Sequence, residues 1–178
     1  PPEILAITAS DPKEEGTAIT IQVSATDVGG DTLTYAFDWE NNGRYDEVNE
    51  SGSASNIWEN DGAYTVGVLV DDGDDGHAFS TIDLAVGNLP PLAVAAGPSG
   101  AVFEGTSINF SGAGSTDPGV QDVLTYRWNF GDGATATGSQ ISHAYADNGV
   151  YSTTLTVTDD AGASSVARLA VTVDNANP

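Results

Sequence analysis

The sequence predicts an all-β protein made of two similar β-sandwiches in tandem, and three observations support this prediction. In residues 124–130, apolar side chains fall at every second position, which is the period of a strand with one buried face. Residues 33–39 show the same alternation and the same Leu-Thr-Tyr start, 91 positions earlier. Neither half of the chain shows the roughly 3.6-residue period of an amphipathic helix.

The first repeat consists of short apolar stretches separated by turn residues. In one of these stretches Ile19, Ile21 and Val23 alternate with polar residues and are expected to point inward. A turn is predicted at Asn42-Gly43, and the acidic loop 71–76 separates the last two stretches. We expect strands at residues 4–7, 18–25, 33–39, 53–58, 64–70 and 80–86.

The second repeat follows the same order as the first. Glu104-Gly105-Thr106 matches Glu15-Gly16-Thr17, and Asn148-Gly149-Val150-Tyr151 matches Asp61-Gly62-Ala63-Tyr64. About seven short strands per repeat, with a turn signal every eight to twelve residues or so, predict a sandwich of the immunoglobulin type. The chain has no cysteine, so the Cys–Trp–Cys pattern of antibody domains is missing.

The boundary between the repeats is expected at the Gly-Asn-Leu-Pro-Pro run of residues 87–91, which interrupts the strand pattern. This places one domain at 1–88 and the other at 89–178. The ends, Pro1-Pro2 and Asn177-Pro178, resemble linkers, so we expect the chain to be a segment of a longer protein.

The charge balance excludes several partners. The chain has 26 acidic residues against four basic ones, which are Lys13, Arg44, Arg127 and Arg168. Nucleic acid and anionic membranes require positive charge, and no stretch is apolar for long enough to span a membrane. Two explanations of the acidity stay open: Asp and Asn ligands for a divalent cation such as Ca²⁺, or a surface adapted to salty surroundings.

The second repeat resembles the polycystic kidney disease (PKD) domain. The resemblance is carried by Trp128-Asn129-Phe130-Gly131-Asp132-Gly133, His143-Ala144-Tyr145, Gly149-Val150-Tyr151 and Leu155-Thr156-Val157-Thr158-Asp159. The main departure is Asn129, where the family usually has Asp. The first repeat is a looser copy, with Asn56 and Trp58 at the His and Tyr positions. The resemblance implies a non-catalytic, sandwich-shaped module of extracellular and cell-surface proteins that commonly occurs in tandem.

A calcium site is predicted at the joint between the repeats. In this topology the C-terminal end of repeat one should face the N-terminal end of repeat two. The candidate ligands there are Glu15, Glu59, Asp61, Asn88, Asp117, Asp122, Asp159 and Asp160. Such a set suits the roughly six to eight oxygen ligands of Ca²⁺, and an ion would turn a flexible joint into a rigid one. The alternative is that these residues are ordinary polar loop tips.

Acidic residues at the start of repeat one and at the end of repeat two are expected to form similar joints with flanking domains. Asp27, Asp31 and Asp72 would lie at the N-terminal end of repeat one and serve a preceding domain. The closing run 174–178 is similar in part to the Asp/Asn-rich linkers of cadherins and would serve a following one.

A further metal candidate is the loop of residues 38–46. Asp38, Glu40, Asn42 and Asp46 occupy positions one, three, five and nine of a pattern similar to an EF-hand loop, with Gly43 at position six. No helix follows, and position twelve is not the Glu that an EF-hand requires there. The alternative is a simple hairpin turn at Asn42-Gly43.

No catalytic constellation is evident. The resemblance implies a structural hydrogen bond for His143, and His77 lies in an acidic loop where solvation is expected. Trp39, Trp58 and Trp128 are expected in the core, so no exposed aromatic strip is evident.

The sequence therefore predicts a non-catalytic module of a secreted or cell-surface protein, which spaces or presents flanking domains of the same chain. Ca²⁺ at the joints would set its stiffness. The alternative is an accessory module that brings a secreted hydrolase to polysaccharide or fibrous protein. A third hypothesis is homophilic adhesion, which a Ca²⁺-dependent dimer would support.

Overall fold

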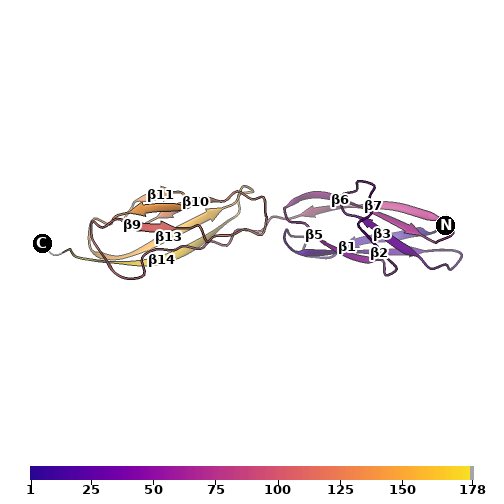
Figure 1. Cartoon of the computed structure of the whole chain (residues 1–178), viewed down its shortest axis with the longest axis horizontal. Helices are drawn as coiled ribbons and strands as arrows, with labels where there is room; N and C mark the ends of the chain where they lie inside the picture. Colours follow the sequence, from indigo (N-terminus) through magenta and orange to yellow (C-terminus); the bar gives the residue numbers. More distant parts are fainter. Residues whose placement is uncertain (177–178) are drawn as a thin grey trace. The chain divides into compact units, whose positions relative to one another are not determined.

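The computed structural model describes residues 1–176, which form two compact units divided after Asn88. Unit 1 is Pro1–Asn88 and unit 2 begins at Leu89. Each unit is a sandwich of β-strands (Figure 1), which confirms the predicted all-β fold class. The described residues contain no helix, and hence none that could cross a membrane.

Unit 1 has seven strands in two sheets. They are β1 (Glu3–Ala9), β2 (Ala18–Thr26), β3 (Thr34–Asp38), β4 (Glu47–Asn49), β5 (Ser53–Ile57), β6 (Gly62–Asp71) and β7 (His77–Val86). One sheet has the order β1-β2-β5 and the other β4-β3-β6-β7. All these pairings are antiparallel.

Unit 2 also has seven strands. They are β8 (Val102–Phe103), β9 (Ile108–Ser111), β10 (Thr125–Asn129), β11 (Thr135–Thr137), β12 (Gln140–His143), β13 (Gly149–Thr158) and β14 (Ser164–Asp174). The larger sheet has the order β11-β10-β13-β14-β8, in which only the β14–β8 pairing is parallel. The smaller sheet is β12-β9, and an isolated bridge joins Ala96 to Ser111 of β9.

The two aromatic strands occupy equivalent central places. In β3 Phe37 pairs with Val68 of β6, and in β10 Trp128 pairs with Leu155 of β13. Phe37, Val68, Trp128 and Leu155 are completely buried, as the period-two pattern predicts. Burying a large apolar side chain contributes roughly 1.5–3 kcal/mol, so each strand stabilises the middle of its sandwich.

Each unit has its own core, and all three tryptophans contribute to it as predicted. Trp128 is fully buried, and its indole Nε1–H donates to the carbonyl of Gly138 at 3.0 Å. Trp39 and Trp58 are 8% and 5% exposed in the core of unit 1.

The two repeats match residue by residue in the sheet pairings. Asn56 pairs with Ile19 in unit 1, as His143 pairs with Ile108 in unit 2. The carbonyl of Trp58 accepts from Gly16 N–H, as that of Tyr145 accepts from Gly105 N–H, both at 2.8 Å. Unit 2 therefore serves as a reference for each position in unit 1.

Candidate functional site

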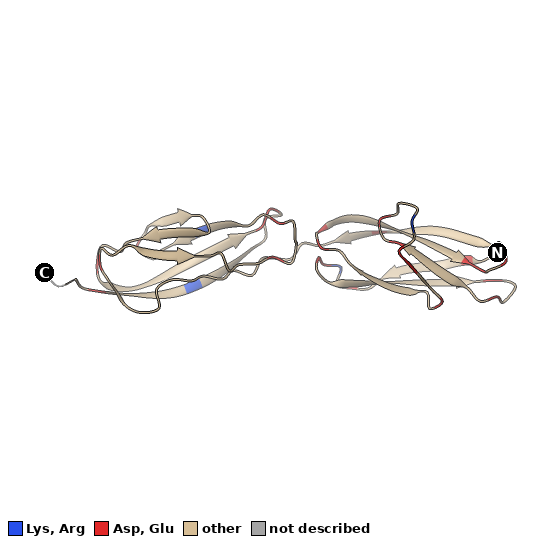
Figure 2. Cartoon of the chain, in the orientation of Figure 1, with Lys and Arg blue, Asp and Glu red and all other residues tan. Residues whose placement is uncertain are grey.

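The acidic residues lie mainly in loops and at strand ends (Figure 2). Unit 1 carries 18 of the 26, and unit 2 carries the other eight. The predicted metal ligands fall into four groups, at the N-terminal end of unit 1, the N-terminal end of unit 2, the C-terminal end of unit 1 and the loop after β3.

At the N-terminal end of unit 1 the structure brings Asp27, Asp31 and Asp72 together. Oδ1 of Asp27 and Oδ2 of Asp72 lie 3.5 Å and 3.7 Å from the Pro1 ammonium nitrogen. A Cβ placed on Gly29 would collide with Oδ2 of both Asp27 and Asp31. The loop after β2 and the loop after β6 thus direct three carboxylates to one place.

The second carboxylate oxygen of Asp27 and that of Asp72 accept hydrogen bonds from backbone N–H groups of their own loops. Oδ2 of Asp27 accepts from Gly29 N–H at 2.5 Å, and Oδ1 of Asp72 accepts from Asp74 N–H and Gly76 N–H at 3.0 and 2.9 Å. The pKa of Asp72 is lowered, chiefly because Asp74 N–H donates to it, while the Gly76 N–H and the Pro1 ammonium act in the same direction against the effect of burial. Asp72 therefore carries a full negative charge at neutral pH.

In unit 2 the corresponding acidic residues also accept hydrogen bonds from backbone N–H groups of the loops at its N-terminal end. Oδ1 of Asp117 accepts from Gly119 N–H at 3.0 Å, and Oδ1 of the buried Asp159 accepts from Ala163 N–H at 2.8 Å. Oδ1 of Asp160 accepts from Val123 N–H at 3.2 Å, which connects the β13–β14 loop to the loop that contains Asp122.

At the C-terminal end of unit 1, Glu15 is completely buried and its Oε2 accepts from Asp61 N–H at 2.9 Å. The backbone N–H of Glu15 donates to the carbonyl of Gly87 at 3.0 Å, next to Asn88. Glu59 is exposed in the turn that precedes Asp61. One oxygen of Glu15 thus has a structural role, because it holds the turn before β6 against the corner before β2.

The loop after β3 brings three carboxylates together. One oxygen from each of Asp38, Glu40 and Asp46 lies within 4.8 Å of the other two, so this group could hold a metal ion. Oδ1 and Oδ2 of the buried Asp38 accept from Asn42 N–H and Gly43 N–H at 3.0 and 2.6 Å. Asp46 Oδ2 accepts from Trp39 N–H at 3.0 Å, so these acids also shape the turn.

Asn42, the fourth predicted ligand in this loop, is also engaged in the turn. Its Oδ1 accepts from Arg44 N–H at 2.9 Å, and its Nδ2 donates to Glu40 Oε2 at 3.3 Å. The closing 174–178 run is described only to Ala176, whose N–H donates to Glu104 Oε1 at 3.3 Å. Asn177 and Pro178 lie outside the described residues.

His143 makes the structural hydrogen bond that the resemblance implied. Its Nε2 lies 2.7 Å from Asp132 Oδ2, and its ring stacks on Phe130 with 4.0 Å between centroids. Burial acts to raise the pKa of Asp132, but the Ala134 N–H and the His143 ring outweigh it and lower this pKa. The pair fixes the Gly-Asp-Gly turn to β12.

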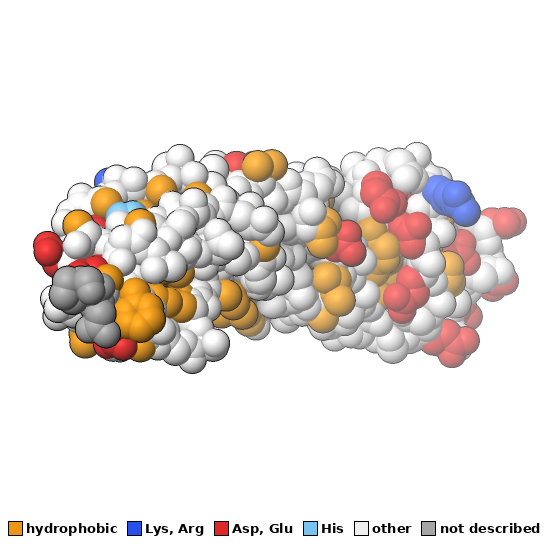
Figure 3. Space-filling model, turned by 60° about the vertical axis from the view of Figure 1, so that its left-hand side comes forward, with side chains coloured by type: hydrophobic (Ala, Val, Ile, Leu, Met, Phe, Trp, Pro, Cys, Tyr) orange, Lys and Arg blue, Asp and Glu red, His pale blue; other side chains and the backbone are white. Residues whose placement is uncertain are grey.

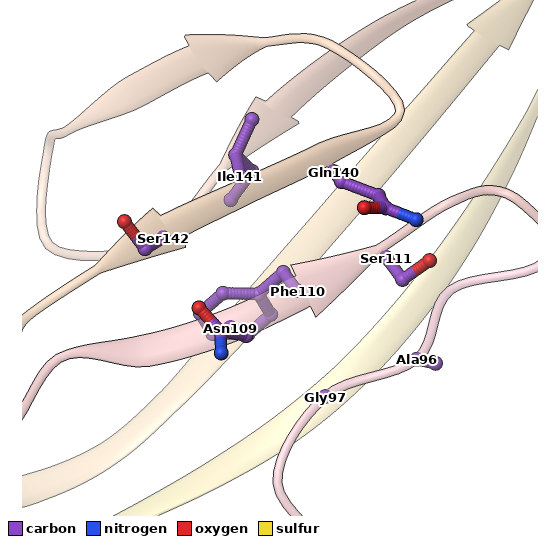
Figure 4. A pocket seen from close by; sticks show the side chains of 8 residues that line it. All are labelled: Ala96, Gly97, Asn109, Phe110, Ser111, Gln140, Ile141 and Ser142. Atoms are coloured by element: carbon purple, nitrogen blue, oxygen red, sulfur yellow. The ribbon is translucent and has the colours of Figure 1, made fainter.

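One cavity lies away from the acidic groups, and another is lined in part by Glu40 and Glu59. The first, of about 530 Å³, lies over β9 and β12 of unit 2 (Figure 4). Its lining holds only uncharged residues, namely Ala96, Gly97, Asn109, Phe110, Ser111, Gln140, Ile141 and Ser142. This lining offers no group for acid–base or metal chemistry.

The other cavity, of about 620 Å³, lies in unit 1 and was not predicted from the sequence. Trp39 and Trp58 line it, although both also belong to the core, as expected. A sequence feature that could have pointed to this cavity is Asn56, which occupies the position of His143 in the second repeat.

Both units match the family model of the PKD domain, over residues 1–86 and 88–173. The chain belongs to the PKD domain family. This confirms the resemblance for the second repeat and extends it to the looser first one. The chain is therefore a tandem pair of PKD units.

The curated relatives of these PKD units are much longer proteins. A microbial collagenase of Vibrio alginolyticus is 37% identical over 90 residues, which are 51% of this chain and 11% of the relative. Collagenase ColA of Clostridium perfringens is 30% identical over 156 residues, 80% of this chain and 14% of the relative. The chain thus spans only a small part of the length of either relative.

A solved structure with similar sequence is the PKD1 domain of Vibrio anguillarum Epp. It is 27% identical, with a TM-score of 0.43, and the match covers 51% of this chain and all of that domain.

Proposed function

We propose that this PKD pair is a non-catalytic module of a secreted or cell-surface protein, which spaces or presents flanking domains and is stiffened by Ca²⁺. The observation that carries the proposal is the convergence of Asp27, Asp31 and Asp72 at the N-terminal end of unit 1. In unit 1, Asp27 and Asp72 share one cation, the Pro1 ammonium. In a longer chain this nitrogen would be uncharged, and a bound metal ion could replace its charge.

The chemistry of these groups favours Ca²⁺ among common cations. The donors are carboxylate oxygens from two loops, and hard oxygen ligands in flexible geometry are what Ca²⁺ prefers. Asp72 is charged at neutral pH, and a divalent ion would offset its repulsion with Asp27 and Asp31. The corresponding residues of unit 2 are Asp117, Asp122, Asp159 and Asp160.

An ion at the joint between the units stays a prediction. Its further ligands would come from Glu15, Asp61 and Asn88, at the end of unit 1. Within unit 1, the hydrogen bond from Asp61 N–H to Glu15 supports this prediction, because it places Glu15 beside the Asp61 turn.

A second candidate function is an accessory module that attaches a secreted hydrolase to an insoluble substrate. The similarity to parts of two bacterial collagenases favours it. In that case the flanking domains include a hydrolase, and the partner is a fibrous protein or polysaccharide.

Thermal unfolding with excess Ca²⁺ or with EDTA, at fixed ionic strength, tests the calcium proposal. A ligand that binds only the folded state stabilises it by about 2.7 kcal/mol at a hundredfold excess over its dissociation constant. We expect a rise of several degrees for the transition of each unit that binds an ion.

Variants assign the ion to its site. Asp72→Asn should abolish the rise that Ca²⁺ causes in the unfolding temperature of unit 1. Asp117→Ala or Asp159→Asn should abolish the corresponding rise for unit 2. Glu50→Gln and Asp147→Asn, at exposed positions outside these groups, should leave both rises intact. An equal rise with NaCl and with CaCl₂ at the same ionic strength would show instead that the acidity is an adaptation to salt.

A further inference from the structure

The 620 Å³ cavity of unit 1 is an oxygen-rich cleft with an aromatic floor. It lies between the loop after β3, the end of β5 and the start of β6, and includes no basic residue. The floor is Trp39, Trp58 and Tyr64, and the rim carries the carboxylates of Glu40 and Glu59. Three amide side chains, Asn41, Asn56 and Asn60, complete the polar lining.

One ring that unit 2 has at the equivalent place is absent from the cleft. In unit 2, Phe130, His143, Tyr145 and Tyr151 form a continuous series of ring contacts, with centroids 4.0, 4.7 and 4.1 Å apart. The equivalent residues in unit 1 are Trp39, Asn56, Trp58 and Tyr64, and all four line the cleft. Asn56 therefore places an amide group, where unit 2 has a ring, in the lining of the cleft.

The aromatic floor is held rigidly by the core. Trp39 stacks on Phe37 with 5.6 Å between centroids, and Trp58 meets Trp39 edge to face at 5.9 Å. Tyr64 lies 5.8 Å from Trp58, and its hydroxyl donates to the carbonyl of Asn60 at 2.9 Å. A ligand would therefore meet a preformed surface, which lowers the entropic cost of binding.

The charge of the site selects a cation. Two carboxylates and three aromatic rings line the cleft with no basic residue among them, and cations are attracted both to carboxylates and to the faces of aromatic rings. Unit 1 as a whole carries 18 acidic residues against two basic ones, so its field also draws cations toward the cleft.

We propose that this cleft binds an arginine side chain in an extended, basic segment of a partner polypeptide. A guanidinium is planar, so it can lie against an aromatic ring and donate to carboxylate and amide oxygens at its edge. The volume exceeds that of one side chain and can also admit neighbouring backbone. The proposal supplies a ligand for the second candidate function and does not depend on calcium at the ends of the units.

The test is a chemical-shift titration of the full chain with the peptide acetyl-Gly-Arg-Gly-amide in EDTA. The matched probe has citrulline, the uncharged analogue of arginine, at the central position. We expect the arginine peptide to shift the indole signal of Trp58 and the amide signals of Asn41, Asn56 and Asn60. The citrulline peptide should bind about tenfold more weakly, because the cationic contribution is lost.

Variants locate the site. Asn56→His restores the ring of the second repeat and should abolish binding, while Glu59→Gln should weaken it about fivefold or more. Glu50→Gln removes the same charge from an exposed position outside the cleft and should leave binding unchanged. Glu59 is exposed, so its variant keeps the test valid even if Asn56→His perturbs folding.

Equal binding of the arginine and citrulline peptides would overturn the proposal. So would shifts produced by a neutral oligosaccharide such as cellohexaose but not by the arginine peptide, which would identify a sugar site. Because EDTA is present throughout, loss of peptide binding is distinguishable from failure of the calcium proposal.

Discussion

At the scale of single residues, Tyr145 shows how a polar atom is accommodated in the core of unit 2. Its ring is 1% exposed, and its hydroxyl lies 2.7 Å from Thr153 Oγ1 and 3.1 Å from the carbonyl of Phe130. The equivalent pair in unit 1 is Trp58 and Val66, in which neither side chain carries a hydroxyl. The two positions have therefore changed together between the repeats.

Tyr145→Phe should destabilise unit 2 by about 1–2 kcal/mol, because Thr153 and the Phe130 carbonyl lose a buried partner. Urea unfolding measures the change. Tyr151→Phe is the matched control, since its hydroxyl bonds the Asp147 carbonyl at an exposed turn and should cost less than about 1 kcal/mol. Equal losses in the two variants would contradict the role assigned to the buried hydroxyl.

The same residue predicts a loss of stability in alkali. Burial raises the pKa of Tyr145, and the negative charge of Asp132 adds to this against the hydrogen bond from Thr153. A phenol whose pKa is higher in the folded state stabilises the fold below its unfolded pKa of about 10, and this contribution is lost as the pH rises through the folded pKa.

The free energy of unfolding of unit 2 should therefore fall above about pH 10. Tyr145→Phe should remove this part of the dependence, as measured by urea unfolding at several pH values. A profile that is identical in the variant would assign the alkaline loss to other groups.

At the scale of elements, the turn after β10 is fixed by two glycines in the left-handed region. Gly131 has φ 84° and Gly133 has φ 97°. A Cβ on Gly131 would lie 2.9 Å from the carbonyl oxygen of Ser152, whereas a Cβ on Gly133 would meet nothing within 4 Å.

Gly133→Ala should lower the free energy of unfolding of unit 2 by about 1–2 kcal/mol, because a residue with a side chain is disfavoured in the left-handed region. Gly131→Ala should cost clearly more, because it adds a collision with backbone that cannot move aside. Thermal unfolding of both variants makes the comparison. If Gly133→Ala proved the more harmful, the packing explanation would be wrong.

Sequence reasoning predicted the elements whose side chains alternate. The strands around Ile19 and Ile21, and around Trp128, are where they were expected, because one face of each must be buried. The strands β4 and β11 were not predicted, since each has three residues, lies at a sheet edge and has no apolar alternation.

The candidate sites were predictable to a different extent. The loops that carry Asp27 and Asp72 were identified from their acidity and from topology, because the repeats place equivalent loops at equivalent ends. The engagement of Asp38 with backbone N–H groups was not predictable, since a ligand pattern and a turn pattern use the same residues. The cleft was not predictable, because the change from His143 to Asn56 is visible in the sequence but does not show which residues line a cavity.

At the scale of the whole molecule, the two units differ in charge although they share a fold. Unit 1 carries 18 acidic residues and unit 2 carries eight, and each has two basic residues. On the face shown in Figure 3 the acidic side chains are denser on unit 1. Self-repulsion should therefore reduce the stability of unit 1 more than that of unit 2.

Raising NaCl from about 0.01 M to about 0.15 M shortens the screening length from about 30 Å to about 8 Å. The melting temperature of unit 1 should therefore rise more than that of unit 2, as measured by calorimetry. Gly131→Ala identifies the transition of unit 2, because it should lower that transition alone. A larger salt response in the transition that Gly131→Ala shifts would contradict this prediction.

The parallel pairing near the ends of each unit has a mechanical consequence. In unit 2, β8 runs parallel to the end of β14, with Val102 opposite Val173. In unit 1 a parallel bridge joins Glu14 to Gly87. When the chain is pulled from both ends, the first and last segments of a unit slide past each other, so their hydrogen bonds are loaded in shear and must break together. Rupture under tension is governed by the unfolding barrier. We therefore expect hydrogen bonds that are loaded together to resist tension better than bonds that open one at a time. A protein whose parts must hold their spacing under flow or traction would gain from such a clamp in every unit.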